Sequence, residues 1–149
     1  MAEILIDTNV LVYAHDRSAM AKQRQAIEIL SKLQLAGGGH LSAQCLSEFF
    51  WVVTRGPMPK LTLSEAVRQT DRLARVWPVL DITSYIVLEA ARGVHEHQLS
   101  FWDAQIWAAA RLNQIPVVFS EDFDTGAVIE GVRFVNPFSD DFDSSRWGL

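Results

Sequence analysis

The chain has 149 residues, of which 49% are hydrophobic and 21% are charged, a composition typical of globular domains. Its net charge of −5 excludes a general attraction to nucleic acid, so binding of a polyanion would require local positive charge. The sequence has no apolar run as long as a membrane span, no basic segment ahead of a cleavage site, and one cysteine, Cys45, which cannot form an internal disulfide. We therefore expect a single domain over residues 1–149, located in a reducing cytoplasm.

The pattern of apolar residues predicts strands and helices that alternate along the chain. In chain order, it predicts a strand at 2–6, helices at 9–15 and 20–35, a strand at 40–43, helices at 44–55 and 62–77, a strand at 78–82, helices at 83–97 and 101–112, and strands at 116–120 and 132–135. This alternation is typical of an α/β fold in which a short parallel sheet of four or five strands lies between helices on both faces. Residues 140–149 form a polar tail that we expect to be loosely held.

Four acidic residues fall where such a fold would place a ligand site. In parallel α/β folds, ligands bind at the carboxyl ends of the strands, where helix N-termini also lie. Asp7 ends the first strand, and Asp122 follows the strand at 116–120. Glu48 lies in the first turns of the helix after the second strand, and Asp103 begins the apolar stripe of the helix that leads into the strand at 116–120. We therefore expect the four carboxylates to share one edge of the sheet.

Each acid also has an ordinary structural explanation. Asp7 could cap the helix that follows it, and Asp103 could form a capping box with Ser100. Glu48 could be a solvated helix residue, and Asp122 could belong to a polar turn. Caps do not need to cluster at one edge, however, and neighbouring carboxylates raise one another's pKa unless a cation screens them. The predicted clustering therefore favours a cation site.

The residue types indicate which cation this site would bind. Carboxylate oxygens suit Mg²⁺ or Mn²⁺, whereas zinc usually recruits cysteine or histidine. His95 and His97 face apart on their helix, and His15 and His40 lie in separate connections. We interpret all four histidines as structural or surface residues, and Cys45 as a small buried side chain.

Four segments of the chain resemble the PIN-domain ribonucleases, and specifically the VapC toxins of type II toxin–antitoxin pairs. In the order and spacing of that family they are ILIDTNVLVYA, LSAQCLSEFFWV, LSFWDAQIWAAA and PVVFSEDFD. The resemblance implies that the four acids of the family fall on Asp7, Glu48, Asp103 and Asp122. Asp124 is the alternative fourth acid and ranks second, because Asp122 lies two positions after Ser120, the hydroxyl residue of the family's pattern. Asn9 matches a residue that helps to order the site.

The resemblance also implies a fold, an activity and partners. The fold is the PIN-like arrangement of three layers. The activity is hydrolysis of RNA phosphodiester bonds with Mg²⁺ or Mn²⁺ as cofactor and a metal-activated water as nucleophile. The implied partners are an RNA substrate, a second copy of the chain in a homodimer, and a small antitoxin protein that blocks the acidic pocket.

Residues outside the acidic cluster are candidates for contacts with RNA or protein. Arg55 and Lys60, on the loop after the helix of Glu48, are the candidates for phosphate contact. A stripe of three arginines is interpreted as a solvated helix face; its members are Arg68, Arg72 and Arg75. Trp51 lies off the apolar stripe of its helix and is a candidate for a protein interface, whereas Phe49 and Phe50 belong to the core.

Two other enzyme classes are disfavoured. A phosphatase of the haloacid-dehalogenase type needs a second aspartate two residues after the first, where this chain has Asn9. A nucleotide-binding Rossmann module needs a glycine-rich turn after the first strand, and Thr8-Asn9-Val10 contains no glycine. The non-enzymatic alternative is a catalytically silent PIN-like module that binds RNA or protein.

Overall fold

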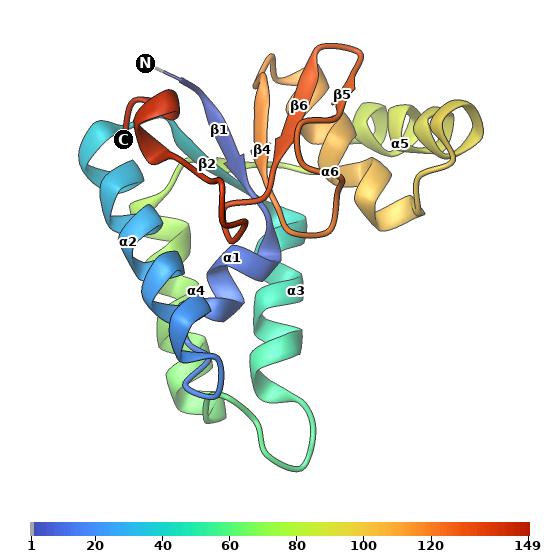
Figure 1. Cartoon of the computed structure of the whole chain (residues 1–149). Coiled ribbons are helices and arrows are strands. Elements are labelled where there is room, and N and C mark those ends of the chain that lie inside the picture. The colour runs from blue at the N-terminus through green and yellow to red at the C-terminus, as the bar shows by residue number, and fades with distance from the viewer. Residues whose placement is uncertain (1) are drawn as a thin grey trace.

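The computed structural model describes residues 2–149, which form a six-stranded sheet flanked by helices (Figure 1). The strands lie in the order β3-β2-β1-β4-β6-β5. Their bounds are β1 Ile4–Ile6, β2 Gly39–Ser42, β3 Val79–Leu80, β4 Val117–Phe119, β5 Val128–Ile129 and β6 Val132–Val135. Neighbouring strands pair in parallel, except that β5 is antiparallel to β6. The α/β fold with a parallel central sheet is thus confirmed.

The helices cover both faces of this sheet. They are α1 Thr8–Tyr13, α2 Met20–Ala36, α3 Ala43–Thr54, α4 Leu63–Val76, α5 Ser84–His97 and α6 Phe101–Leu112, followed by the 3₁₀ helix η1 Ser144–Trp147. The chain runs from β1 through β2 to β3 and then returns past β1 to β4, so right-handed crossovers place α1–α4 and α5–α6 on opposite faces. Figure 1 shows α2 and α4 on one side of the sheet and α5 and α6 on the other. Within residues 2–149, no helix has both the length and the apolar character that crossing a bilayer requires.

The sheet has a switch point between β1 and β4. These strands are neighbours, but β1 leads to β2 on one side and β4 leads to β6 on the other. Their register pairs Ile6 with Phe119, so Asp7 and Ser120 emerge side by side at the carboxyl edge. Open α/β sheets bind ligands at such points, where the crossovers diverge.

The strands that hold this edge are completely buried. Ile4, Leu5 and Ile6 of β1 have no exposed surface, and neither have Val118 and Phe119 of β4. A continuous apolar run is the pattern of a parallel strand covered on both faces, and it anchors the residues that follow each strand. The edge is therefore supported by close-packed core on both sides.

The sequence pattern does not predict β5. It forms a hairpin with β6, and the two turn residues, Glu130 and Gly131, both have positive φ angles of 46° and 86°. Positive φ at both positions is typical of a type I′ turn, whose twist matches that of the flanking strands. The sheet therefore has six strands, one of them antiparallel, where four or five parallel strands were expected.

The expectation of a loosely held tail at residues 140–149 is wrong. The rings of Phe142 and Trp147 meet Phe119 edge to face, with centroids 5.6 and 6.1 Å apart. Leu149 also packs against the core. The polar residues of this segment face solvent, while its few apolar side chains cover the sheet next to β4.

A candidate active site at the carboxyl edge of the sheet

Asp7 is buried at the switch point, where three groups hold it. Its Oδ1 accepts the backbone N–H of Thr8 at 2.7 Å, so Asp7 is the N-cap of α1, as the ordinary explanation expected. Its Oδ2 accepts the hydroxyl of Ser120 at 2.6 Å, across the boundary between β1 and β4. The backbone N–H of Asp7 donates to the carbonyl of Phe119 at 3.0 Å. The carboxylate therefore caps α1 and is also hydrogen-bonded to Ser120, the residue that follows β4.

Ser120 organises this side of the site. Besides donating to Asp7, its hydroxyl accepts the backbone N–H of Asp122 at 3.0 Å and the side-chain Nδ2 of Asn9 at 3.2 Å. With Asp7 ionised, the single hydroxyl proton is used on Asp7, so Asn9 must present its NH₂ group to Ser120. Oδ1 of Asn9 is consequently left buried and without a hydrogen-bond partner within residues 2–149.

Glu48 approaches Asp7 from α3. Its Oε2 accepts the hydroxyl of Thr8 at 2.7 Å, and its Oε1 accepts Nε2 of Gln44 at 2.7 Å. Thr8 directly follows Asp7, so this hydrogen bond links α1 to α3 next to the buried acid. Glu48 is therefore a fixed member of the cluster and not the freely solvated residue of the alternative explanation.

Asp103 reaches the same cluster from the N-terminus of α6. Its backbone N–H donates to the hydroxyl of Ser100 at 3.2 Å, so the expected cap is present. Burial raises the pKa of Asp103, and the charges of Asp122 and Glu48 raise it further. The carboxylate is thus half-buried and electrostatically coupled to two acids from distant parts of the chain.

The pKa of Asp7 reflects both its burial and its acidic neighbours. Burial raises the pKa of Asp7 from 3.8 to about 7, against the lowering effect of its hydrogen bonds. The charges of Asp122 and Glu48 add to the increase. Asp122 and Asp124 are both exposed, but only Asp122 is among the charges that raise the pKa values of Asp7 and Asp103. These charge effects indicate that Asp7, Glu48, Asp103 and Asp122 lie near one another, and they favour Asp122 over Asp124.

The shifted pKa makes stability depend on pH when divalent cations are absent. The folded state keeps a proton on Asp7 that the unfolded chain loses above pH 3.8, so the free energy of unfolding should fall as the pH rises to about 7. The contribution of Asp7 is at most about 4 kcal/mol. We expect urea unfolding in EDTA to show this fall in wild type, and to show a flatter pH dependence in Asp7→Asn. Equal pH dependence in both proteins would contradict the buried, protonated Asp7.

The four acids form an open cluster and not a closed cage. Within residues 2–149, the one group of three or more potential ligands whose ligand atoms all lie within 4.8 Å of one another is found elsewhere, at Glu96, His97 and Glu130. Like charges at the switch point repel one another, and Glu48 is held by Thr8 and Gln44. The donors nevertheless fit a hard cation, because they are carboxylate oxygens with the unpaired Oδ1 of Asn9 beside them.

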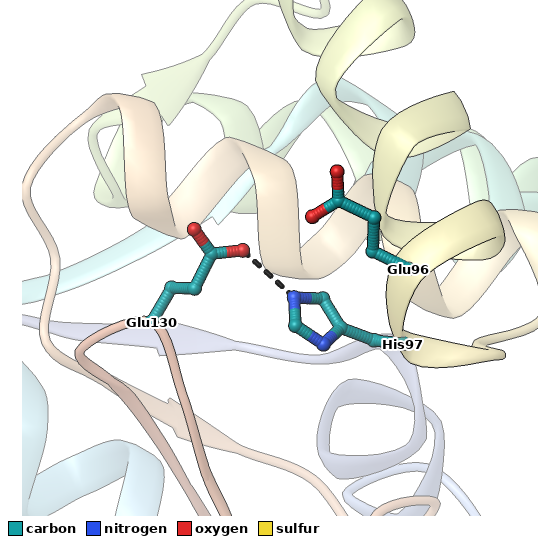
Figure 2. A group of neighbouring side chains, drawn as sticks. All are labelled: Glu96, His97 and Glu130. Atoms are coloured by element: carbon teal, nitrogen blue, oxygen red, sulfur yellow. Dashed lines mark hydrogen bonds and ion pairs between the residues drawn. The ribbon is translucent and has the colours of Figure 1, made fainter.

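The group formed by Glu96, His97 and Glu130 is an ion-pair network (Figure 2). Nε2 of His97 lies 2.7 Å from Glu130, and the guanidinium of Arg92 donates to both oxygens of Glu130 at 3.0 and 2.9 Å. Arg92 also donates to Glu96 at 2.7 Å. Because a guanidinium already neutralises these carboxylates, they are poor ligands for a metal ion. His97 is thus a structural residue that ties α5 to the β5–β6 turn.

The other candidates lie outside the cluster. Arg55 follows α3 and is exposed; its guanidinium lies 5.7 Å from the ring centre of Trp51. Lys60 is exposed on the same loop, and both residues remain predictions for phosphate contact. Trp51 is 62% exposed. Cys45 is buried, and burial raises the pKa of its thiol to about 12, which makes it unreactive.

The remaining basic and histidine residues behave as surface or packing residues. The arginines of α4 are exposed, and two of them make contacts within their own helix, Arg68 with Ser64 and Arg75 with Asp71. The ring of His15 packs on Phe49, with centroids 5.5 Å apart. This agrees with the interpretation of the α4 stripe as a solvated face.

Three polar residues of the site are missed by sequence reasoning. Thr8 binds Glu48 directly. Gln44 is buried and connects Glu48 to the backbone carbonyl of Trp102 at 3.1 Å, and Gln105 donates to Oε1 of Gln44 at 2.8 Å. The only sequence signal was the presence of two amides on largely apolar helices, where an unpaired polar group would be costly.

The fold and this acidic site define a PIN-like α/β protein. A model of the PIN domain matches residues 4–130, so the chain belongs to the PIN domain family. This confirms the resemblance seen in the sequence. No curated protein is a significant match to the sequence.

The structure is similar to those of several proteins from toxin–antitoxin pairs. A toxin–antitoxin complex from Klebsiella pneumoniae matches with a TM-score of 0.64 and 19% identity, covering 91% of this chain and 98% of that chain. VapC20 of Mycobacterium tuberculosis, a toxin that cleaves the sarcin–ricin loop, matches with a TM-score of 0.61 and 22% identity, covering 88% and 99%. DNA-bound VapBC from Salmonella typhimurium matches with a TM-score of 0.65 and 15% identity, covering 90% and 97%. At these identities the likeness shows a common fold.

Proposed function

We propose that this protein is an endoribonuclease that depends on Mg²⁺ or Mn²⁺ and acts as the toxin of a toxin–antitoxin pair. The observation that carries the proposal is the convergence of four acids from distant segments on the switch point of a PIN domain. Burial of Asp7 near other carboxylates raises its pKa to about 7, so its ionised form is unfavourable. A divalent cation would stabilise that ionised form. The similarity to a toxin that cleaves an RNA loop supports RNA as the substrate.

Each residue has a distinct part in this proposal. Asp7 and Asp103 would hold the cation, with Glu48 and Asp122 completing the site. A bound cation supplies an activated water and neutralises charge that develops on the scissile phosphate. Glu48 or Asp122 would take the proton of that water. Ser120 fixes the orientation of Asp7 by donating to Oδ2 at 2.6 Å.

The net charge of the chain is consistent with these roles. With a net charge of −5, the molecule as a whole repels RNA, so positive charge must be local. The cation would provide it at the acids, and Arg55 and Lys60 would supplement it on the loop after α3. Arg55 lies seven residues beyond Glu48, about 10 Å along the helix, a distance that an RNA strand of a few nucleotides spans.

The proposed partners are an antitoxin and a second copy of the chain. The solved structures that resemble this one include toxins in complex with their antitoxins. Helix α5 exposes large apolar side chains, with Tyr85 75% and Leu88 69% exposed, and we propose this face for the homodimer. The single buried cysteine fits the reducing cytoplasm in which such pairs would act.

Metal dependence is the direct test of the proposal. We expect the purified chain, free of antitoxin, to cleave single-stranded RNA with Mg²⁺ or Mn²⁺ at least about 100-fold faster than in EDTA, because the cation supplies several kcal/mol of charge stabilisation. Restoring the metal after EDTA should restore the rate. Gel analysis of end-labelled RNA measures both. If no RNA is cleaved under any of these conditions, the chain is the silent binding module.

A further inference from the structure

A groove lies directly beside the acids. Its volume is about 610 Å³, and it is lined by residues of α3 and α6 and by Ile82, which follows β3. Glu48 forms part of its wall, so the groove is continuous with the candidate active site. The volume is in the range of pockets that hold small organic groups.

Two indole rings line this groove. Trp51 comes from α3 and Trp102 from the first turn of α6, and each is 62% exposed. Trp102 directly precedes Asp103, and the guanidinium of Arg55 lies beside the ring of Trp51. Exposed aromatic rings next to a positive charge are the usual means by which proteins bind the bases of single-stranded nucleic acid.

A chain of buried amides also reaches the groove. A carboxylate only accepts hydrogen bonds, so Glu48 requires the NH₂ group of Gln44 to face it. Oε1 of Gln44 must then face the NH₂ group of Gln105, as observed at 2.8 Å. This orientation leaves Oε1 of Gln105 without a donor within residues 2–149, although Gln105 is only 6% exposed and lines the groove.

We propose that this groove binds an unpaired nucleobase of the RNA strand that is cut at the acids. The proposal rests on the nuclease function and names a part of its substrate. A base would stack on Trp51 or Trp102 and donate an N–H to Oε1 of Gln105. An apolar side chain of a protein partner would instead cover this oxygen and leave it unpaired, which is costly. The substrate is therefore RNA with a single-stranded nucleotide next to the scissile phosphate.

The test uses short single-stranded RNAs in which one nucleotide at a time lacks its base. We expect kcat/KM to fall about tenfold or more when the missing base is at one position beside the cleaved bond, and little elsewhere. Trp51→Leu should cause a similar loss with intact RNA and no further loss with that abasic RNA. Trp51→Phe, which keeps an aromatic face, should restore most of the rate. Leu35→Ala, which shortens an apolar side chain of α2 that is 90% exposed and lies outside the groove, is the control.

The outcomes separate this proposal from the nuclease function. If wild type cleaves every abasic RNA as fast as intact RNA, the base subsite is wrong and the nuclease stands. If wild type cleaves no RNA, both proposals fail. Sedimentation of the same variants provides a further check. If Trp51→Leu changes the oligomeric state while discrimination against abasic RNA persists, the groove is an interface between copies of the chain.

Discussion

Asp7→Asn should abolish RNA cleavage almost completely. The substitution keeps the size of the side chain and the acceptor for the N–H of Thr8, but it removes the negative charge at the buried centre of the cluster. Losing about 3–4 kcal/mol of metal-dependent stabilisation corresponds to a fall of about 10²–10³-fold in kcat/KM. Initial rates at saturating Mn²⁺ measure the loss.

Two further variants serve as controls for this prediction. Asp124→Asn changes an exposed acid two residues from Asp122 and should cleave RNA like wild type. Asp122→Asn should lose most of its activity, because the charge of Asp122 acts on both Asp7 and Asp103. If Asp7→Asn is as active as wild type, the activity belongs to a contaminant. If Asp124→Asn is the inactive member of the pair, Asp122 is not the fourth acid.

Trp107→Ala should be the most destabilising single substitution in the α5–α6 layer. Trp107 is fully buried, and its Nε1 donates to the carbonyl of Ile129 at 3.1 Å. Gly93 on α5 makes room for the indole, since a Cβ there would lie 2.7 Å from Cζ3 of Trp107. Truncation leaves a large cavity and an unpaired carbonyl, which should cost about 3–5 kcal/mol. Urea denaturation measures this as a lower midpoint.

The control for this variant is an apolar residue of the same layer that is more exposed. Val87→Ala on α5 shortens a side chain that is 40% exposed and should change the free energy of unfolding by about 0.5 kcal/mol or less. A loss below about 1 kcal/mol in Trp107→Ala would mean that the layer closes around the missing ring and that Trp107 does not join α6 to the β5–β6 hairpin.

The position of the acids could be predicted from the sequence because it follows from topology. Asp7 directly follows a buried apolar strand, and Ser120 follows another, so their proximity needs only that the two strands be parallel neighbours. Asp103 lies at the first turn of a helix that runs back into β4, which places it at the same edge. The coarse fold and the acidic edge were therefore accessible from local patterns.

The polar contacts around the acids could not be predicted in this way. The bond between Gln44 and the carbonyl of Trp102 depends on how α3 and α6 are placed relative to each other, which no local pattern specifies. The bond between Thr8 and Glu48 likewise depends on how α1 packs on α3. Hydrogen bonds across elements require positions accurate to a few tenths of an ångström, whereas apolar spacing defines only which face of a helix is buried.

The hairpin and the tail were missed for different reasons. The β5–β6 turn contains Glu130, an unusual residue at a positive φ, where asparagine or glycine gives the familiar signal. Arg92 and His97 hold the side chain of Glu130 and stabilise this turn from α5. In the tail, Phe142 and Trp147 are too far apart for a strand or helix period to reveal them, and only their contacts with Phe119 bury them.

The packing of Phe142 and Trp147 against Phe119 predicts how truncation of the C-terminal segment would affect the site. Phe119 directly precedes Ser120, so these rings support the strand that delivers the hydroxyl to Asp7. A premature stop codon soon after Val135 would leave all four acids encoded but remove that support. If the chain is a toxin, as proposed, selections for harmless alleles would recover such truncations. These alleles would have lost the support behind Ser120 although they keep every catalytic group.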